Sequence, residues 1–297
     1  MKGTELCRRA LGRPGVFVLA VIVWMGAWVG ALELMGAGAG PEGPRASPTC
    51  DPGFMERVVP SWKTGGALAR DPTRVAPEWY RVTRGVVEVD VAFPVVSPAF
   101  RARVQGWVEE AVRELEESAR LHEESLREQG ESPRASLEVR YAVGYLDSKL
   151  VSVLLCVGGA VRGAAHPWSD AWVLNFLPDE DRPLETAEMF RPGWRPEAAW
   201  RRTCARQIAR RMIREESFSS CGIDEDEEAC VRREAGEWEG HLLHYEAWGR
   251  VWLTAEGLVF VFSNFPHAVG EVQGCRAPWK AARPALRPEV RRRLGRP

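Results

Sequence analysis

The stretch LVSVLLCVGGAVRGAAHPWSDAWVLNFL, residues 150–177, predicts the centre of the fold. Its apolar run, Leu150–Val157, is rich in Val and Leu and too short to span a membrane. Such a run favours a buried strand. A loop with glycine, histidine and proline follows, and the chain returns as a second apolar stretch, Ala171–Leu177. We therefore expect two strands with a loop between them.

Strands and helices are interspersed on either side of this stretch. Alternation in Gly85–Phe93 predicts a half-buried strand, and hairpins are expected within 137–157 and 251–262. Apolar residues at three- and four-residue spacing predict two long helices, which begin near Ser97 and Pro196. The expected fold class is α+β, a single domain with an antiparallel sheet packed on one face by two long helices.

The amino-terminal residues are typical of an export signal. A basic flank precedes an uncharged apolar run and a stretch of small residues, so residues 1–40 are expected to be a signal peptide or an N-terminal membrane anchor. Residues 41–84 are rich in Pro and Gly and indicate a tether or leader. An ordered extension from Phe54 onward fits equally well. The domain itself is expected over residues 85–297.

Cysteine usage agrees with export. The chain has seven cysteines, and Cys7 lies in the basic flank. An even number remains, which permits up to three disulfides in an oxidising compartment. These disulfide candidates are Cys50, Cys156, Cys204, Cys221, Cys230 and Cys275. The sequence selects no connectivity. Cys221–Cys230 is the first choice because its loop is short, whereas Cys156 could equally be a free core thiol.

Composition and motifs argue against several functions. Forty Lys and Arg balance 41 Asp and Glu, so no basic field indicates a nucleic-acid partner. No catalytic motif, no CxxC pair and no cofactor fingerprint occurs, so no cofactor and no metal are expected. The acidic run 224–228 lacks the ligand alternation of an EF-hand and is interpreted as a solvated loop. The histidine pair His241 and His244 lacks an identifiable further ligand.

The order of motifs resembles the RsiV-like extracytoplasmic domain. An apolar strand ends near Gly159, the loop Gly163–Pro167 reads G-A-A-H-P, and an alternating strand with Asn175 follows. Residues 257–270, GLVFVFSNFPHAVG, are similar to the closing strand and loop of that family. The resemblance covers about residues 85–290. Such domains occur in lysozyme-sensing bacterial anti-sigma factors and beside the catalytic domain of some polysaccharide deacetylases.

The resemblance implies a non-catalytic binding domain. In the lysozyme-sensing members, loops of this domain dock on lysozyme, which points here to loops 163–170 and 263–274. The candidate ligand-binding residues are Gly163, His166, Pro167, Trp168, Phe265, Pro266 and His267. Phe265 stands where a tyrosine is usual. Neither a sigma-binding domain nor a deacetylase domain is identifiable, so this chain resembles the sensing domain alone.

We therefore expect an exported or membrane-anchored cell-envelope binding module, in the periplasm or on the outer face of a bacterial cytoplasmic membrane. Its expected partner is a protein such as lysozyme or a cell-wall component. If the N-terminal segment is retained, it also holds the chain to the membrane. Two alternatives stay open. One is a cell-wall or carbohydrate hydrolase, or a deacetylase-like enzyme, that uses His166 with His267. The other is a structural envelope protein without a ligand.

Overall fold

The computed structural model describes residues 50–58, 77–214, 221, 225–243, 248, 250–263, 265 and 272–295. All of them belong to one compact unit, Ala46–Pro297. The expected export segment, residues 1–40, lies outside the described residues. In the described part of the range expected to be a tether, the chain forms one helix and one strand. In the described part of the chain, no helix combines the length and apolar character needed to cross a bilayer.

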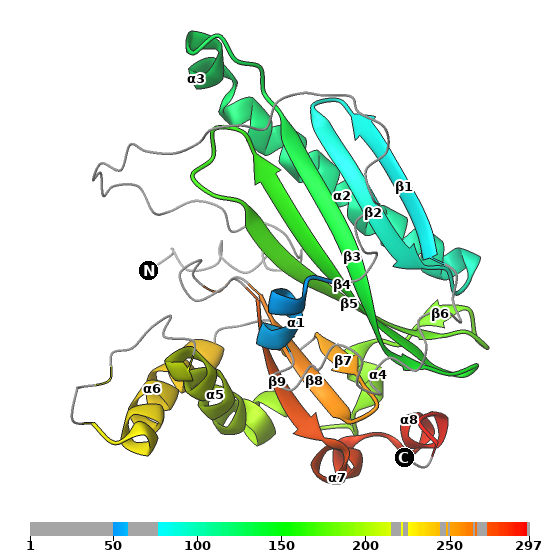
Figure 1. The fold of residues 1–297 in the computed structure, drawn as a ribbon. Coiled ribbons are helices and arrows are strands. Elements are labelled where there is room, and N and C mark those ends of the chain that lie inside the picture. Colours follow the sequence, from blue (N-terminus) through cyan, green and yellow to red (C-terminus); the bar gives the residue numbers. More distant parts are fainter. Residues whose placement is uncertain are drawn as a thin grey trace, which may run out of the picture. The chain divides into compact units, whose positions relative to one another are not determined.

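The described residues form an α+β domain with two sheets and eight α-helices (Figure 1). The six-stranded sheet has the order β1-β2-β3-β4-β5-β6, and the three-stranded sheet has the order β7-β8-β9. The strands are β1 Pro77–Arg84, β2 Val87–Pro94, β3 Ala135–Leu146, β4 Val151–Val161, β5 Trp168–Leu177, β6 Arg182–Pro183, β7 Val251–Leu253, β8 Gly257–Phe262 and β9 Gln273–Pro278. The helices are α1 Pro52–Val58, α2 Pro98–Leu121, α3 Glu123–Glu128, α4 Thr186–Met189, α5 Pro196–Arg214, α6 Glu227–Leu242, α7 Trp279–Ala282 and α8 Pro288–Arg293.

The six-stranded sheet is largely antiparallel, as its sequence predicts. Residues 150–177 form β4 and β5, which pair antiparallel with Val153 opposite Leu174. One pair differs from the expectation, because β2 and β3 run parallel. The reason is the connection between them. Since α2 carries the chain from the end of β2 back to the level where β2 began, β3 starts in the same direction.

Helix α2 forms where its cap and its apolar stripe predict it. The Ser97 side chain accepts a hydrogen bond from the Phe100 backbone N–H at 3.1 Å, and proline occupies the first turn. These features satisfy an otherwise unpaired amide and preset the helical backbone. Phe100, Val104 and Val108 are among the helix residues that are buried against the sheet.

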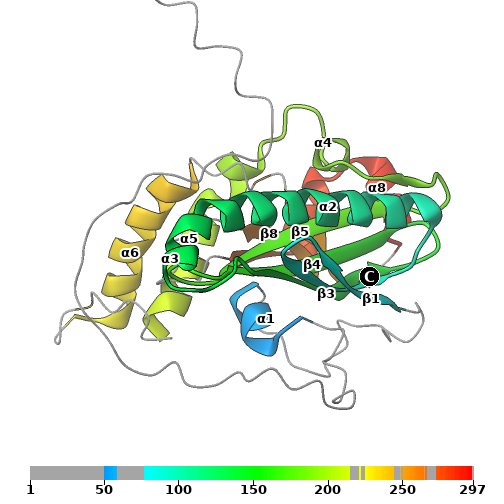
Figure 2. The ribbon, with the colours of Figure 1, turned by 90° about the horizontal axis from the view of Figure 1, so that it is seen from above.

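The prediction that two long helices cover one face of one sheet is not confirmed. Helix α2 lies along one face of the six-stranded sheet, and α1 lies on the opposite side (Figure 2). Helix α5 instead packs against β9 of the three-stranded sheet and against α6. An apolar stripe shows that a helix is buried, but it does not show which sheet it meets.

The two sheets are joined by a buried polar contact between β4, β5 and β7. The Ser152 hydroxyl donates to Asn175 Oδ1 at 2.6 Å and accepts the Leu253 backbone N–H at 2.9 Å. Asn175 Nδ2 donates to the Val251 carbonyl at 2.7 Å. Because each buried polar group has a partner, this contact fixes β7 on the sheet without an unpaired polar atom.

All six cysteines after Cys7 form disulfides. The bonds are Cys50–Cys156, Cys204–Cys275 and Cys221–Cys230. The short-loop pair chosen from the sequence is one of them, and Cys156 is not a free thiol. The first bond ties Cys50, two residues before α1, to the middle of β4 across 106 residues, so the six-stranded sheet is covalently linked to the amino-terminal extension.

Asp90 on β2 joins two arginines on the face of the sheet opposite α2. Its carboxylate lies 2.5 Å from Arg81 Nη2 and 3.3 Å from Arg140 Nη2. Burial acts to raise the pKa of Asp90, but the hydrogen bond from Arg81 and the charge of Arg140 together hold this pKa below its usual value. The charged form of Asp90 is therefore the form that stabilises the fold.

We expect the Asp90→Asn substitution to lower the free energy of unfolding by about 1 kcal/mol at neutral pH. A lowered pKa contributes stability above the unfolded pKa, about 3.9 for aspartate, and this stability is lost as pH falls through the folded pKa. The difference between wild type and variant should therefore shrink as pH falls below about 4. Urea unfolding at several pH values measures it, with exposed Glu88→Gln on the same strand as control. A difference independent of pH would contradict the account.

Candidate ligand-binding surface

The loop between β4 and β5 contains three of the candidate residues predicted from the sequence, and the fourth, Trp168, begins β5. Gly163 has φ +88, a conformation that favours glycine, and a Cβ there would lie 3.4 Å from the His122 side chain. His166 and Pro167 are exposed. The His166 Nδ1–H donates to the Pro167 carbonyl at 3.1 Å. The loop therefore turns beside the end of α2 and presents the imidazole to solvent.

Trp168 follows the loop as the first residue of β5. Its indole covers the backbone of Gly159 on β4, where an added Cβ would lie 2.3 Å from the ring. A larger residue at this position would displace the indole. The glycine is thus required by close packing, and Trp168 is held partly exposed at the edge of the core.

The second predicted loop, 263–274, is only partly described. Phe265 is 3% exposed and packs against Trp238 of α6, with ring centroids 5.2 Å apart. Pro266 and His267 lie outside the described residues. Of the candidates in this loop, the structure therefore places Phe265 in the core between the three-stranded sheet and the helices.

Arg250 joins the near ends of the two loops. Its Nη1 donates to Asp170 Oδ1 at 2.6 Å and to the Ala171 carbonyl at 2.8 Å, both on β5. The same nitrogen donates to the Ser263 hydroxyl at the end of β8. Charge-assisted hydrogen bonds of this kind are among the stronger polar contacts in proteins. The two loops therefore leave the fold from one shared junction.

Three partly exposed tryptophans lie beside this junction, between α2 and β5. We name Trp107, Trp168 and Trp172 the tryptophan strip. The rings of Trp107 and Trp172 are 5.8 Å apart, and the Arg103 guanidinium lies 5.2 Å from the Trp107 ring. Tryptophan combines a large apolar surface with a polar N–H, a combination that is enriched at the centre of binding interfaces.

Carboxylates accompany the tryptophan strip. Glu110 and Glu114 follow Trp107 on the same side of α2, because their spacing of three and four residues returns to one helix face. Burial, followed by the negative charge of Glu110, raises the pKa of Glu114, and the charge of Asp170 contributes. Arg113 lies 3.8 Å from Glu110, and Arg250 lies 2.6 Å from Asp170. The surface beside the strip therefore carries charges of both signs and complements a ligand with polar and charged groups.

In the sequence, Trp107 falls in the apolar pattern of the helix predicted from Ser97, and Trp172 falls in the apolar stretch Ala171–Leu177, and nothing relates the two. Both patterns describe only one side of each indole, because the rings lie at the edge of the core. The available signal was the i, i+4, i+7, i+11 series from Arg103 to Glu114, which marks a single helix face. That this helix face lies opposite β5 can be seen only in the three-dimensional structure.

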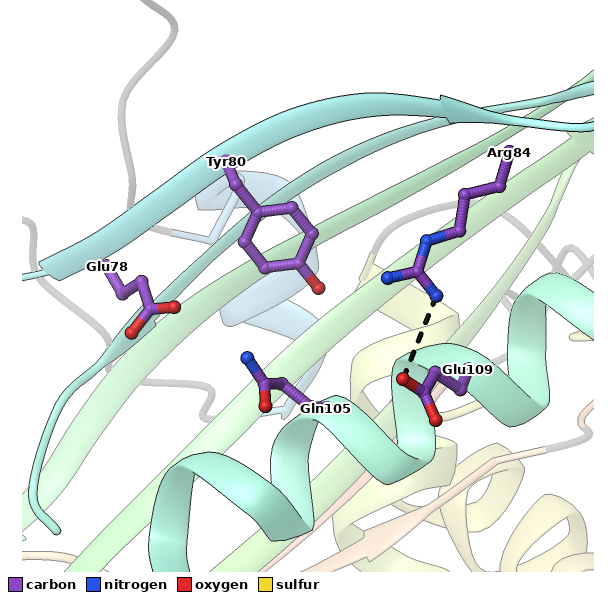
Figure 3. A pocket seen from close by; sticks show the side chains of 5 residues that line it. All are labelled: Glu78, Tyr80, Arg84, Gln105 and Glu109. Atoms are coloured by element: carbon purple, nitrogen blue, oxygen red, sulfur yellow. Dashed lines mark ion pairs between the residues drawn. The ribbon is translucent and has the colours of Figure 1, made fainter. Parts of the chain in front are cut away.

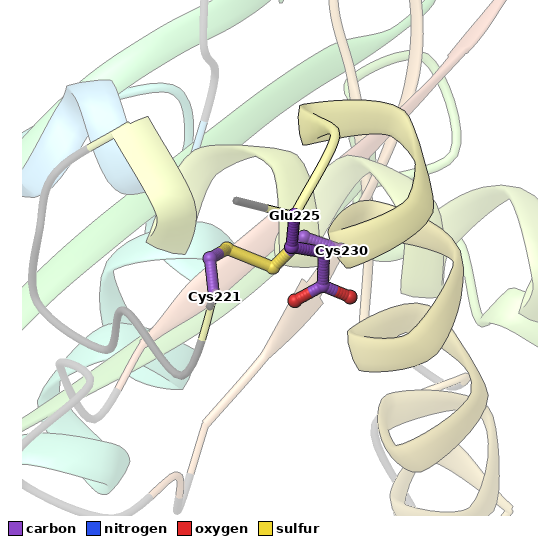
Figure 4. Close-up of side chains that lie close together, drawn as sticks. All are labelled: Cys221, Glu225 and Cys230. Atoms are coloured by element: carbon purple, nitrogen blue, oxygen red, sulfur yellow. A yellow bond between two sulfur atoms is a disulfide. The ribbon is translucent and has the colours of Figure 1, made fainter. Parts of the chain in front are cut away.

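A second group of polar side chains lies at the start of α6. Ligand atoms of Cys221, Glu225 and Cys230 lie within 4.8 Å of one another (Figure 4). The two sulfurs are bonded to each other, whereas cysteine binds metals as a thiolate. The Glu225 carboxylate contacts Arg233 at 3.0 Å. This group is therefore a disulfide (Figure 4) with an adjacent ion pair.

The acidic run 224–228 has structural roles in its described part. The Asp226 side chain accepts the Ala229 backbone N–H at 3.1 Å and so caps α6, and Glu228 contacts Arg210 at 2.9 Å. Acidic residues at this position also complement the helix dipole. Of the two histidines considered from the sequence, His241 lies beside Trp238 with rings 5.3 Å apart, and His244 is outside the described residues.

Comparison with known proteins identifies structural neighbours only. No protein-family model matches the chain, and no curated protein matches it. A DUF3298 family protein from Pseudomonas aeruginosa PAO1 has 15% sequence identity and a TM-score of 0.46, over 74% of this chain and 97% of that chain. A DUF3298 family member from Bacteroides fragilis NCTC 9343 has 14% identity and a TM-score of 0.42, over 79% and 100%. The RsiV-like assignment is not confirmed and stays a resemblance.

Proposed function

We propose that this chain is an extracytoplasmic binding module of the RsiV-like type, which recognises a protein ligand through the tryptophan strip and the two loops joined by Arg250. Its three disulfides support an oxidising compartment. The observation that carries the proposal is the junction itself. Asp170 and Ser263 belong to the two loops, 163–170 and 263–274, that were predicted separately from the sequence. The Arg250 guanidinium binds both residues.

The chemistry of this surface favours a protein as partner. Partly exposed indoles provide large rigid contact areas, and burying them at an interface is a common source of binding energy. Glu110, Glu114 and Asp170 add negative charge around the indoles, and Arg103, Arg113 and Arg250 add positive charge. Such a surface offers complementary partners to the charged and polar groups of a protein ligand. Lysozyme is the probe of choice because the resemblance described above implies it.

We expect Trp172→Ala to weaken binding to lysozyme about thirtyfold, the effect of removing an interface anchor worth about 2 kcal/mol. Trp107→Ala should act in the same direction, because the two rings are adjacent. Isothermal titration of the oxidised full chain with lysozyme measures both dissociation constants. Trp194→Ala is the matched control, since Trp194 is also partly exposed but stacks on Phe190 beyond α4.

The outcomes of this titration are distinct. A saturable complex that weakens in the strip variants and not in Trp194→Ala supports the proposal. Equal binding by all variants would exclude the tryptophan strip as the contact surface. Absence of a lysozyme complex, together with retention of the chain on insoluble peptidoglycan, would assign the surface to a cell-wall glycan and overturn the protein ligand. Thermal unfolding of each variant distinguishes lost contacts from lost folding.

A further inference from the structure

An exposed sheet edge lies on the side of α2 away from the tryptophan strip. Strand β1 pairs with β2 on one side and is the terminal strand of the six-stranded sheet. Five of its eight residues are exposed, so most of its outer edge is open to solvent in the structure. Such an edge presents backbone N–H and C=O groups that can pair with another strand. Val82 on this strand is one of three large hydrophobic residues that remain exposed in the described part of the chain, at 38%.

The side chains of β1 divide between the two faces of the sheet. Glu78, Tyr80 and Arg84 point toward α2 and line a cavity of about 320 Å³ together with Gln105 and Glu109 (Figure 3). Alternation along the strand places Val82 on that same face. Along β1, the side chains on the helix side are therefore acidic, aromatic, apolar and basic, in that order.

This order is complementary to itself when the strand is reversed. Hydrogen-bonded and non-hydrogen-bonded residue pairs alternate along an antiparallel ladder. A two-fold axis between identical strands must therefore pass between a residue and its own copy. An axis midway between two consecutive residues would pair each with the copy of the other, and one of them belongs to a hydrogen-bonded position while the other does not. Only registers centred on a single residue are consistent with two-fold symmetry.

We propose that β1 pairs antiparallel with β1 of a second copy of this chain, with Arg81 on the two-fold axis. In this register Glu78, which also lies 2.6 Å from Arg101 of its own α2, faces Arg84 of the second copy. Tyr80 faces Val82 of the second copy. Each pair occurs twice by symmetry. Opposite charges and aromatic–β-branched pairs are the cross-strand combinations that stabilise sheets. The symmetric register with its axis at Tyr80 is poorer, since it places Val82 against Glu78.

The residue pairs on the sheet face away from α2 are also compatible with this register. Trp79, which lies 5.0 Å from the Arg140 guanidinium, faces Thr83 of the second copy. The two Arg81 side chains meet at the axis, but each is neutralised by Asp90 at 2.5 Å within its own chain. On the helix side, Arg84 lies 3.8 Å from Glu109, a loose ion pair in which the Arg84 side chain stays 45% exposed.

The interface is small, because it consists of one strand edge and the adjacent helix flank. A contact of this size is typical of weak association, and we expect a dissociation constant between about 1 µM and about 1 mM. The proposal does not depend on the tryptophan strip, which lies on the opposite flank of α2. Failure of either proposal therefore leaves the other standing.

Charge reversal provides a direct test with full-length oxidised chain. Glu78→Arg alone places arginine against arginine twice in the dimer, and Arg84→Glu alone places glutamate against glutamate twice. Sedimentation velocity should show each variant self-associating about tenfold more weakly than wild type. An equal mixture of the two variants restores both opposite-charge pairs, so it should form a heterodimer about as stable as the wild-type dimer.

The mixture is its own control for folding, because every intrachain effect of the two substitutions is also present when each variant is measured alone. Arg113→Glu is the matched surface control, since Arg113 also has an ion pair of 3.8 Å, with Glu110 on α2, and its reversal should leave dimerisation unchanged. A wild-type chain that stays monomeric up to about 1 mM, or a mixture that associates no better than its components, would overturn the proposal.

Discussion

The variant Cys50→Ala/Cys156→Ala is expected to lose about 5 kcal/mol of unfolding free energy. The bond between these residues closes a loop of 106 residues, and in the chain-entropy description a longer loop removes more freedom from the unfolded chain. The two cysteines also lie in the buried layer between α1 and the two sheets. Without the bond, α1 keeps only its noncovalent contacts.

The matched comparison is Cys221→Ala/Cys230→Ala, whose loop spans 9 residues. The same relation gives a loss of about 2.5 kcal/mol for this pair. Denaturant unfolding of both variants under oxidising conditions measures the difference. A smaller loss for Cys50→Ala/Cys156→Ala than for the short-loop variant would show that the long-range bond does not anchor α1 in the way described.

The Arg211→Met substitution is expected to lower the free energy of unfolding by about 3 to 5 kcal/mol. Arg211 on α5 is 6% exposed and binds three acceptors from two other segments. It donates to Gln273 Oε1 and to the Gly274 carbonyl, both at 2.7 Å, and to the Arg57 carbonyl at the end of α1. Methionine fills similar space but leaves these buried acceptors without their donor.

Arg210→Met is the control for this substitution, because the neighbouring side chain is 43% exposed and makes a surface ion pair with Glu228. Surface pairs of this kind contribute about 0 to 1 kcal/mol. Urea unfolding compares the two variants directly. Equal losses at positions 210 and 211 would contradict the assignment of Arg211 as the polar link between α5, α1 and β9.

Local patterns in the sequence predicted local structure well. Alternating residues marked β2, the serine before Pro98 marked the start of α2, and the short spacing between Cys221 and Cys230 marked a disulfide that the structure contains. These signals act over a few residues, where backbone propensity and side-chain periodicity are decisive. The α+β class follows from their order along the chain.

Long-range relations could not be predicted in this way. Nothing local indicates that Cys50 bonds Cys156, or that Arg250 binds Asp170 from 80 residues away. The division into two sheets was missed because hairpins at 137–157 and 251–262 give the same pattern whether they share a sheet or not. Phe265 illustrates the same limit. Its aromatic-proline context indicated a loop contact, whereas its ring packs on Trp238.

The central claim is that a protein ligand binds at the tryptophan strip and the Arg250 junction. Hydrogen exchange of the oxidised full chain, with and without lysozyme, tests it most directly. We predict slower exchange in 162–172 and in the part of α2 around Trp107, with β1 unchanged at a fixed low chain concentration. No complex with lysozyme, or protection confined to segments away from α2 and β5, would contradict the account.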